Sequence, residues 1–173
     1  MSEAAPVAKV ARYLVPAGFV AAALLLGFGQ RPVRIAEAGM AGWVATVSGF
    51  NSVTHLGSSV VFQSDGHWVG FTLTAGCTVA LLAAPVLVIA ALVSMTGRLS
   101  TVRLVVSALV ACAALVIVNQ LRLLVVGASI RGWGFADGYE RSHLLLSPIV
   151  STLGVVASIV VFVRVAVSGD RHA

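Results

Sequence analysis

The sequence has 173 residues, of which 59% are hydrophobic and only 10% are charged, and its mean hydropathy is +1.03. These values exclude an ordinary soluble globular domain and indicate a protein that lies in a lipid bilayer. The formal net charge of +5 does not indicate a nucleic-acid partner, because the basic residues are scattered singly along the chain rather than clustered with aromatic residues.

Four apolar stretches are long enough, at about 17 to 25 residues, to cross a hydrocarbon core roughly 30 Å thick. They occupy residues 13–29, 77–96, 104–126 and 143–167. The first follows Lys9 and Arg12 as in a secretory signal, but no small-residue cleavage site comes after it, so we interpret it as a span. We therefore expect an all-α integral membrane protein in which residues 1–173 form a single membrane domain.

The segment between the first two stretches, residues 30–76, is expected to lie outside the membrane. Its first part, residues 30–47, has mixed polarity and predicts an amphipathic helix at the membrane interface. Further along, residues 59–63 and 67–72 flank Ser64-Asp65-Gly66, which is the pattern of a β-hairpin with an Asp-Gly turn. We expect a small extracytoplasmic hairpin that leads directly into the second apolar stretch.

The distribution of Lys and Arg indicates how the chain is oriented. Six of these residues fall on the side of the termini: Lys9, Arg12, Arg98, Arg103, Arg164 and Arg171. Five fall on the opposite side, accompanied by four acidic residues: Arg31, Arg34, Arg122, Arg131 and Arg141, with Glu37, Asp65, Asp137 and Glu140. Since cytoplasmic loops carry the excess of positive charge, we place the termini in the cytoplasm and expect a multi-pass protein of the cell (cytoplasmic) membrane.

Chain topology then predicts a site at the extracytoplasmic face. With four spans, the start of the second, the end of the third and the start of the fourth lie on one side of the membrane. Cys77, Arg122 and His143 occupy these three places, and they are residue types that acyl-transfer chemistry uses. Cys112 lies in the middle of the third span, so we interpret it as a packing residue.

Arg122 is the most unusual residue of an apolar stretch, since an arginine costs roughly 2.5 kcal/mol or more at the bilayer centre. Asn119 lies one turn earlier on the same helix face and could hold the guanidinium. A side chain that extends toward the headgroups is the alternative. An inward position is favoured by small and polar residues at helical spacing on this face: Ala108, Cys112, Leu115, Asn119 and Arg122.

Cys77 and His143 each have a plain alternative, as a small residue at a helix end and as an interfacial histidine without a role. A thiol becomes a useful nucleophile when a nearby cation or base lowers its pKa and water reaches it. His143 begins a stripe of small and polar residues that suits close helix packing: His143, Ser147, Ser151, Gly154 and Ser158. The shared depth of the three candidate residues favours a functional interpretation.

The chemistry that these residues predict is acyl transfer. His143 would take the proton of Cys77 or pair with its thiolate, and the sulfur would attack a peptide carbonyl. Arg122 would stabilise the oxyanion of the tetrahedral intermediate. The product would be a thioester on Cys77, released by water, an amine or another acceptor. The sequence implies no cofactor and no metal.

This arrangement resembles the exosortase/archaeosortase family over roughly residues 57–160. The matching features are a Cys after a short β-like segment (Cys77), an Asn-x-x-Arg near the end of a span (Asn119 with Arg122) and a His that opens a later span (His143). The resemblance implies a membrane-embedded cysteine transpeptidase or protease. It would cleave the C-terminal sorting tail of a membrane-anchored protein substrate, made of a short motif, a hydrophobic span and a basic end, and pass that protein to an envelope acceptor.

Thr78 and Val79 follow the cysteine, where many family members have a glycine soon after it, and we expect fewer spans than many members have. The chain is then either a minimal core or part of an assembly with an additional membrane partner. A different class of function also remains open, in which a non-catalytic membrane subunit or transporter uses Arg122 to bind an anionic group.

Two further features of the sequence bear on function. A metal site would use outer-side residues whose spacing matches no metal motif: His55, Asp65, His67 and His143. The glycine-rich segment 127–142 predicts a loop, which either covers the substrate tail or is an ordinary interfacial loop with anchoring aromatic residues.

Overall fold

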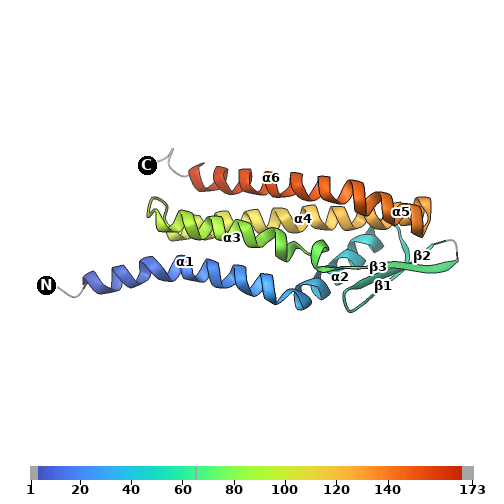
Figure 1. Cartoon of the computed structure of the whole chain (residues 1–173), viewed down its shortest axis with the longest axis horizontal. Helices are drawn as coiled ribbons and strands as arrows, with labels where there is room; N and C mark the ends of the chain where they lie inside the picture. The colour runs from blue at the N-terminus through green and yellow to red at the C-terminus, as the bar shows by residue number, and fades with distance from the viewer. Residues whose placement is uncertain (1–3, 65, 169–173) are drawn as a thin grey trace.

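The computed structural model describes residues 4–64 and 66–168, without the side chains of residues 4–12, 143 and 145. Long helices run side by side along the long axis, and a small antiparallel sheet lies at one end of the molecule, away from both chain ends (Figure 1). This arrangement agrees with the expected all-α membrane architecture that carries a small β-structure.

The described residues form six α-helices and three strands. In chain order these are α1 (Ala4–Phe28), α2 (Gln30–Val47), β1 (Asn51–Leu56), β2 (Ser59–Ser64), β3 (His67–Thr72), α3 (Val79–Met95), α4 (Thr101–Trp133), α5 (Phe135–Arg141) and α6 (Ser147–Val167). A 3-10 turn, Ala75–Cys77, precedes α3, and a π-helical segment, Ser142–Leu146, joins α5 to α6.

Two helices of the described chain are long and apolar enough to cross a membrane. These are α4, with 33 residues, and α6, with 21 residues. Residues Tyr13–Phe28 of α1 and the whole of α2 qualify together as a third, although they are bent by 74°. The apolar helix α3 has only 17 residues. Membrane insertion is therefore supported, with two or three candidate spans, and four spans stay a prediction.

The bend between α1 and α2 lies at Gly29. A Cβ atom at this position would lie 2.6 Å from the carbonyl oxygen of Leu25, so only glycine fits here without a shift of the backbone. Gln30 begins the next helix, and its side chain donates to the carbonyl oxygen of Gly27 at 2.8 Å. The helix expected over 30–47 is thus confirmed, and the bend directs it along the sheet and α4.

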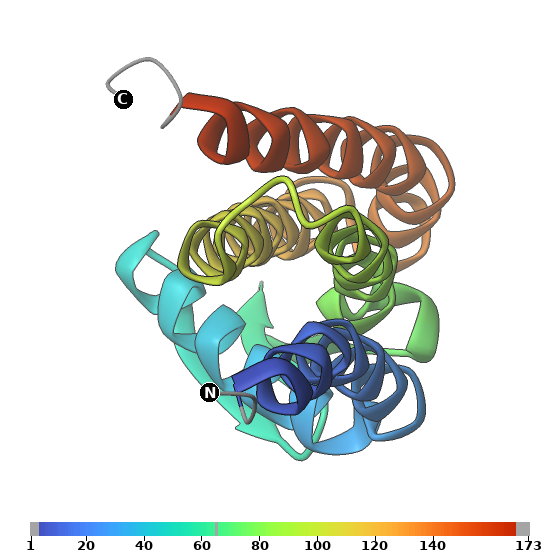
Figure 2. The same ribbon diagram turned by 90° about the vertical axis from the view of Figure 1, so that its left-hand side faces the viewer.

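The long helices pack in the order α1, α3, α4 and α6, as the view along the bundle shows (Figure 2). Their shared core consists mainly of alanine, valine and leucine side chains. The predicted stripe on the last helix does face α4: Ser158 Oγ donates to the carbonyl oxygen of Ala111 at 3.0 Å, and a Cβ atom at Gly154 would meet Val118 at 2.5 Å. Small residues therefore allow α6 to approach α4 closely.

The sheet has the order β1-β2-β3 with antiparallel pairing, and the predicted hairpin corresponds to β2 and β3. Gly66 adopts a φ of +78° in the turn, while Asp65 lies outside the described residues. Val60 and Phe62 alternate toward the helices and are almost fully buried. The additional strand β1 was not predicted, because its residues are mostly polar and exposed and its pairing with β2 is irregular.

The loop predicted over residues 127–142 is wrong. Helix α4 continues through Gly127 and Gly132 to Trp133, and α5 then folds back against it. Glycine allows both helices to pack closely against their neighbours. A Cβ atom at Gly127 would lie 3.3 Å from the Phe50 ring, and one at Gly138 would overlap the carbonyl oxygen of Ser129. Gly127 and Gly138 serve helix contacts, so the segment is helical and forms neither of the two kinds of loop that the sequence left open.

Candidate functional site

Cys77 lies between the end of the sheet and the start of α3. The backbone N–H of Leu73 donates to the carbonyl oxygen of Ser58 at 2.8 Å and thereby extends the β2–β3 pairing beyond Thr72. Thr78 then caps α3, since its side-chain oxygen accepts from the backbone N–H of Ala80 at 3.3 Å. The 3-10 turn that carries Cys77 is thus anchored on both sides, and its side chain is only 6% exposed.

The guanidinium of Arg122 reaches Cys77 across the bundle. Arg122 Nη2 donates to Cys77 Sγ at 3.6 Å, and Thr74 Oγ1 donates to the same sulfur at 3.5 Å. Arg122 is itself only 6% exposed, so the contact is shielded from solvent. A cation so placed stabilises negative charge on the sulfur more strongly than it would in water.

Asn119 connects the arginine to the backbone of the cysteine turn. Its amide group Nδ2 donates to the carbonyl oxygen of Cys77 at 3.2 Å, while its Oδ1 accepts from Arg122 Nη1 at 3.5 Å. The predicted proximity of Asn119 and Arg122 on one helix face is therefore confirmed. The guanidinium is buried within the protein, which contradicts the alternative of a side chain extending toward the headgroups.

Glu37 is a member of this polar cluster that sequence reasoning missed. The carboxylate lies on α2, is 4% exposed, and accepts from the Asn119 amide at 2.6 Å, the Thr78 hydroxyl at 2.5 Å and the Val79 N–H at 2.9 Å. The available signal was a single acidic residue on a helix face of small residues: Glu37, Ala38, Ala41, Gly42 and Ala45. A carboxylate on such a packed face needs buried donors.

The segment that contains His143 begins beside Arg122. The side chains of Ser142, Leu146 and Ser147 lie with Arg122 around a narrow gap between the π-helical segment and α4, which has no room for a water molecule. The backbone of His143 lies within that segment, and its side chain lies outside the described part of the structure. The contact of Cys77 with Arg122 is therefore described, whereas the position of the imidazole is not.

The gap contains polar atoms without a partner among the described residues. Arg122 Nε and Ser147 Oγ are both buried and form no hydrogen bond within this part of the chain. The π-helical hydrogen bond from the Ser147 N–H to the Ser142 carbonyl marks the start of α6, four residues later than the span predicted from 143. Such turns occur frequently at functional sites.

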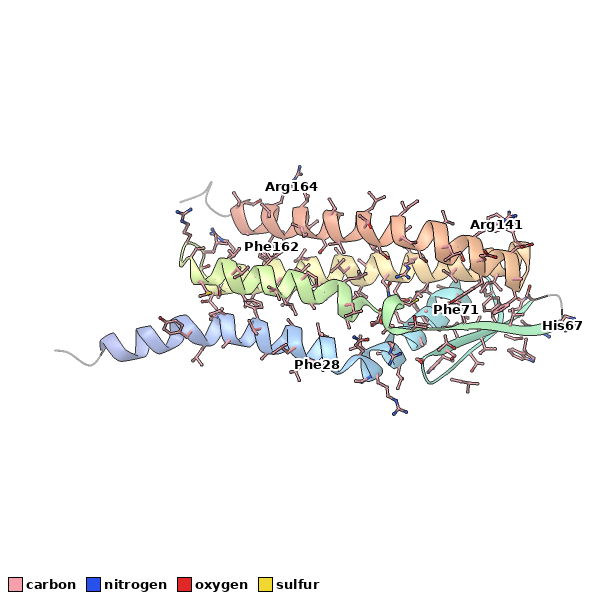
Figure 3. All side chains as sticks on the ribbon, viewed as in Figure 1. Phe28, His67, Phe71, Arg141, Phe162 and Arg164 are labelled. Atoms are coloured by element: carbon pink, nitrogen blue, oxygen red, sulfur yellow. The ribbon has the colours of Figure 1, made fainter. Side chains whose placement is uncertain are left out.

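The rival metal site gains no support from the described side chains. No group of three His, Cys, Asp or Glu side chains within that part of the structure is placed to hold a metal ion, and Asp65 and the His143 side chain lie outside it. His67 lies at the outer tip of the sheet (Figure 3). Because β3 separates His67 from the cysteine turn by six residues, or about 20 Å of extended chain, the two belong to different surroundings.

Fold and site together define a helical membrane protein with a buried polar cluster of Glu37, Cys77, Asn119 and Arg122 at the sheet-bearing end of an apolar bundle. Comparison of the chain with protein-family models, with curated proteins and with solved structures finds no match. The resemblance to the exosortase/archaeosortase family therefore rests on the motif residues alone and stays a prediction.

Proposed function

We propose that this protein is a membrane-embedded, sortase-like cysteine peptidase or transpeptidase. The observation that carries the proposal is the buried contact between Arg122 Nη2 and Cys77 Sγ, 3.6 Å long and formed by residues 45 positions apart. A cysteine that only fills space does not need a guanidinium beside its sulfur, and burying that guanidinium costs free energy. Stabilisation of a thiolate nucleophile accounts for both residues.

The proposed reaction proceeds in two acyl transfers. Cys77 loses its proton to His143, and Sγ then attacks the carbonyl carbon of a peptide bond. Arg122 stabilises the negative charge on the carbonyl oxygen in the tetrahedral intermediate. The C–N bond breaks as the leaving amine takes the proton from His143, which leaves a thioester. Water, an amine or another acceptor then attacks the thioester, and the Cys77 thiol is restored.

The proposed substrate is a membrane-anchored protein with a C-terminal sorting tail, and the proposed site faces the extracytoplasmic side. Cys77 lies at the end of the bundle that carries the sheet and α2, whereas the turn between α3 and α4 lies at the other end (Figure 1). This arrangement supports the proposal, because a peptide bond just outside the hydrophobic span of a substrate would approach the bundle at the level of one membrane face.

Catalysis at Cys77 requires the site to open. The side chain is 6% exposed, and a substrate carbonyl must reach Sγ while Arg122 stays beside it. The π-helical segment Ser142–Leu146 is the proposed moving part, because it borders the gap next to Arg122 and carries His143. Its hydrogen bond from the Ser147 N–H to the Ser142 carbonyl oxygen is that of a π-helical turn, and such turns are frequent at functional sites.

Thiol labelling of intact cells tests the proposal. Cells that express the Cys112→Ala chain are treated with a membrane-impermeant thiol reagent over a range of pH, with and without Arg122→Ala or His143→Ala. We expect Cys77 to label from outside, and the labelling rate at neutral pH to fall in both variants. Arg131→Ala, an exposed change on the same helix, and His67→Ala, at the sheet tip, are the matched controls.

A second assay tests cleavage itself. A reporter protein with a C-terminal motif, hydrophobic span and basic end is co-expressed, and its processing is followed by a change in mass. The proposal expects processing that stops in Cys77→Ala and a thioester-linked intermediate that hydroxylamine releases. If Cys77 labels like an ordinary thiol, indifferent to Arg122 and His143, the catalytic interpretation is wrong and a non-catalytic subunit or transporter becomes the better explanation.

A further inference from the structure

Glu37 is a buried carboxylate to which the proposed reaction gives no part. We propose that Glu37 is a positioning residue that fixes the amide of Asn119, and through it holds Arg122 against the sulfur of Cys77. The inference rests on the proposed role of Cys77 as nucleophile. Glu37 does not touch the reacting atoms in this arrangement, because its partners are Thr78, Val79 and Asn119.

The carboxylate joins three parts of the chain. Glu37 Oε1 accepts from the Val79 N–H at 2.9 Å and from Asn119 Nδ2 at 2.6 Å, whereas Oε2 accepts from Thr78 Oγ1 at 2.5 Å. These partners belong to the first turn of α3 and to α4, at sequence separations of 41 to 82 residues. Short hydrogen bonds to an ionised acceptor are the strong ones, and a carboxylate is favoured at a helix N-terminus.

The inferred effect on Arg122 follows from the chemistry of the Asn119 side chain. One end of an amide only donates and the other only accepts. The Glu37 oxygen beside it is an acceptor, so Nδ2 must face Glu37 and Oδ1 must face the opposite direction. Arg122 has donors only, and its Nη1 meets that oxygen at 3.5 Å. Glu37, together with the Cys77 carbonyl oxygen that accepts from the same nitrogen, therefore selects the one orientation of the amide that holds the guanidinium.

The same orientation leaves the guanidinium available to the sulfur. A carboxylate in direct contact with Arg122 would form a bidentate pair and withdraw the donors from Cys77. With Asn119 between them, Arg122 Nη1 is bound to the amide while Nη2 is directed at Cys77 Sγ. Asn119 also donates to the Cys77 carbonyl oxygen at 3.2 Å, which ties the cysteine turn to the same amide. What Glu37 must supply is therefore an acceptor at a fixed place.

Two substitutions of Glu37 can distinguish the position of the acceptor oxygen from its charge. Glu37→Gln keeps the length of the side chain and removes the charge: its oxygen can serve Val79 and Asn119, and its amide N–H can donate to Thr78 Oγ1. Glu37→Asp keeps the charge but is shorter by one methylene group, so it cannot reach all three donors. A positioning role tolerates the first change and not the second.

The test is the alkylation rate of Cys77 in purified full-length protein in lipid nanodiscs, in the Cys112→Ala background that leaves a single thiol. Iodoacetamide is the probe, and the rate is measured from pH 5 to pH 9. Glu140→Gln and Glu140→Asp, the same two changes at an exposed residue of α5, are the matched controls. Elution as a single peak in size-exclusion chromatography shows that each variant is folded.

We expect Glu37→Gln and both controls to react within about twofold of the parent, and Glu37→Asp to react roughly tenfold more slowly near neutral pH. Glu37→Asp combined with Asn119→Ala should be no slower than Asn119→Ala alone, because Glu37 acts through that amide. Slowing by Glu37→Gln as large as or larger than that by Glu37→Asp would show that an acceptor in the right place does not suffice without the charge, and no slowing by Glu37→Asp would show that the place of the acceptor is not needed; either result overturns the proposal.

The same data separate this inference from the proposed function. If alkylation depends on Arg122 but not on Glu37→Asp, the positioning role fails and the nucleophile role stands. If the rates follow Glu37 and Asn119 as expected while no tailed substrate is processed, the positioning role stands and the sortase-like function fails.

Discussion

Two neighbouring buried amides of α4 have opposite surroundings. Asn119 is 1% exposed and bonds to Glu37, to the Cys77 carbonyl oxygen and to Arg122. Gln120 is 6% exposed, and its two amide atoms have no hydrogen-bond partner among the described residues. A buried amide stabilises a fold only when its partners are present, because its desolvation otherwise costs free energy.

This contrast gives a stability prediction. Asn119→Leu leaves Glu37 and Arg122 without their shared partner, and we expect it to destabilise the protein by about 2–4 kcal/mol. Gln120→Leu removes unpaired polar atoms and should be neutral or stabilising. Thermal unfolding in detergent, followed by circular dichroism, measures both. Equal effects of the two substitutions would contradict the importance of the polar cluster.

Ser147 lines the gap beside Arg122 and is 3% exposed. Its hydroxyl has no partner among the described residues, so Ser147→Ala should change the unfolding temperature little. If substrate occupies the gap, the same change should reduce cleavage of a tailed reporter by about tenfold through the loss of one hydrogen bond. Ser151→Ala, one turn further along α6, is the control.

At the scale of elements, the fold depends on helices that approach each other at glycine. Gly138 in α5 faces the carbonyl oxygen of Ser129 in α4, with no room for a side chain. Gly132, near the end of α4, has open space around it. Gly138→Ala should therefore cost about 1–3 kcal/mol of stability by overpacking, whereas Gly132→Ala should gain about 0.5 kcal/mol from better helix propensity. Thermal unfolding of both variants checks whether the first lowers and the second raises the unfolding temperature.

The bend at Gly29 makes a related prediction for the site. Gly29→Ala forces its new Cβ against the carbonyl oxygen of Leu25 and must shift α2, which carries Glu37. We expect slower alkylation of Cys77 in this variant. Gly18→Ala, at an open position of α1, should react at the parent rate. A parent-like rate in Gly29→Ala would mean that α2 keeps its place without the bend.

The elements differ in how far the sequence predicted them. Apolar runs predicted the long helices, and Asp65-Gly66 predicted the hairpin, because both patterns are local. Strand β1 lacks such a pattern and forms through its pairing with β2. The helical form of residues 127–133 was missed because glycine disfavours helices unless a neighbour, here Phe50, needs its small size.

The sequence predicted those site residues that lie on the same helix or at the same depth in the helix bundle. Asn119 and Arg122 are three residues apart on one helix, and topology placed Cys77 near them. Glu37 escaped because its partners lie 41 to 82 residues further along the chain, where no local pattern reveals them. These long-range hydrogen bonds form because α2 packs against α3 and α4. The residue pattern of a single helix does not reveal that packing.

At the scale of the whole molecule, the structure is asymmetric along its long axis. The apolar halves of α1, α3, α4 and α6 fill one end, and the sheet, α2 and the polar cluster occupy the other (Figure 1). Near the C-terminal end of α6, Phe162 points into the bundle while Arg164, two residues on, points outward (Figure 3). This asymmetry suits a protein whose apolar end lies in a bilayer.

The four-span topology makes the final prediction. In a Cys77→Ala, Cys112→Ala background, Thr54→Cys in the sheet and Thr96→Cys after α3 place single thiols at exposed positions at the two ends. With cytoplasmic termini, an impermeant reagent should label Thr54→Cys in intact cells and Thr96→Cys only after the membrane is opened. Labelling of both in intact cells would contradict the topology.

The distance along the chain between Glu37 and Asn119 also affects how the protein is made. During synthesis, Glu37 leaves the ribosome 82 residues before the amide that binds it. Until then the carboxyl group of Glu37 lacks one of its hydrogen-bond donors, and a polar group without its partners is costly to place in hydrocarbon. Helix α2 can therefore take its final place only after the partners of Glu37 on α3 and α4 have been made. The contact between Arg122 and the sulfur of Cys77 can likewise form only when α4 arrives.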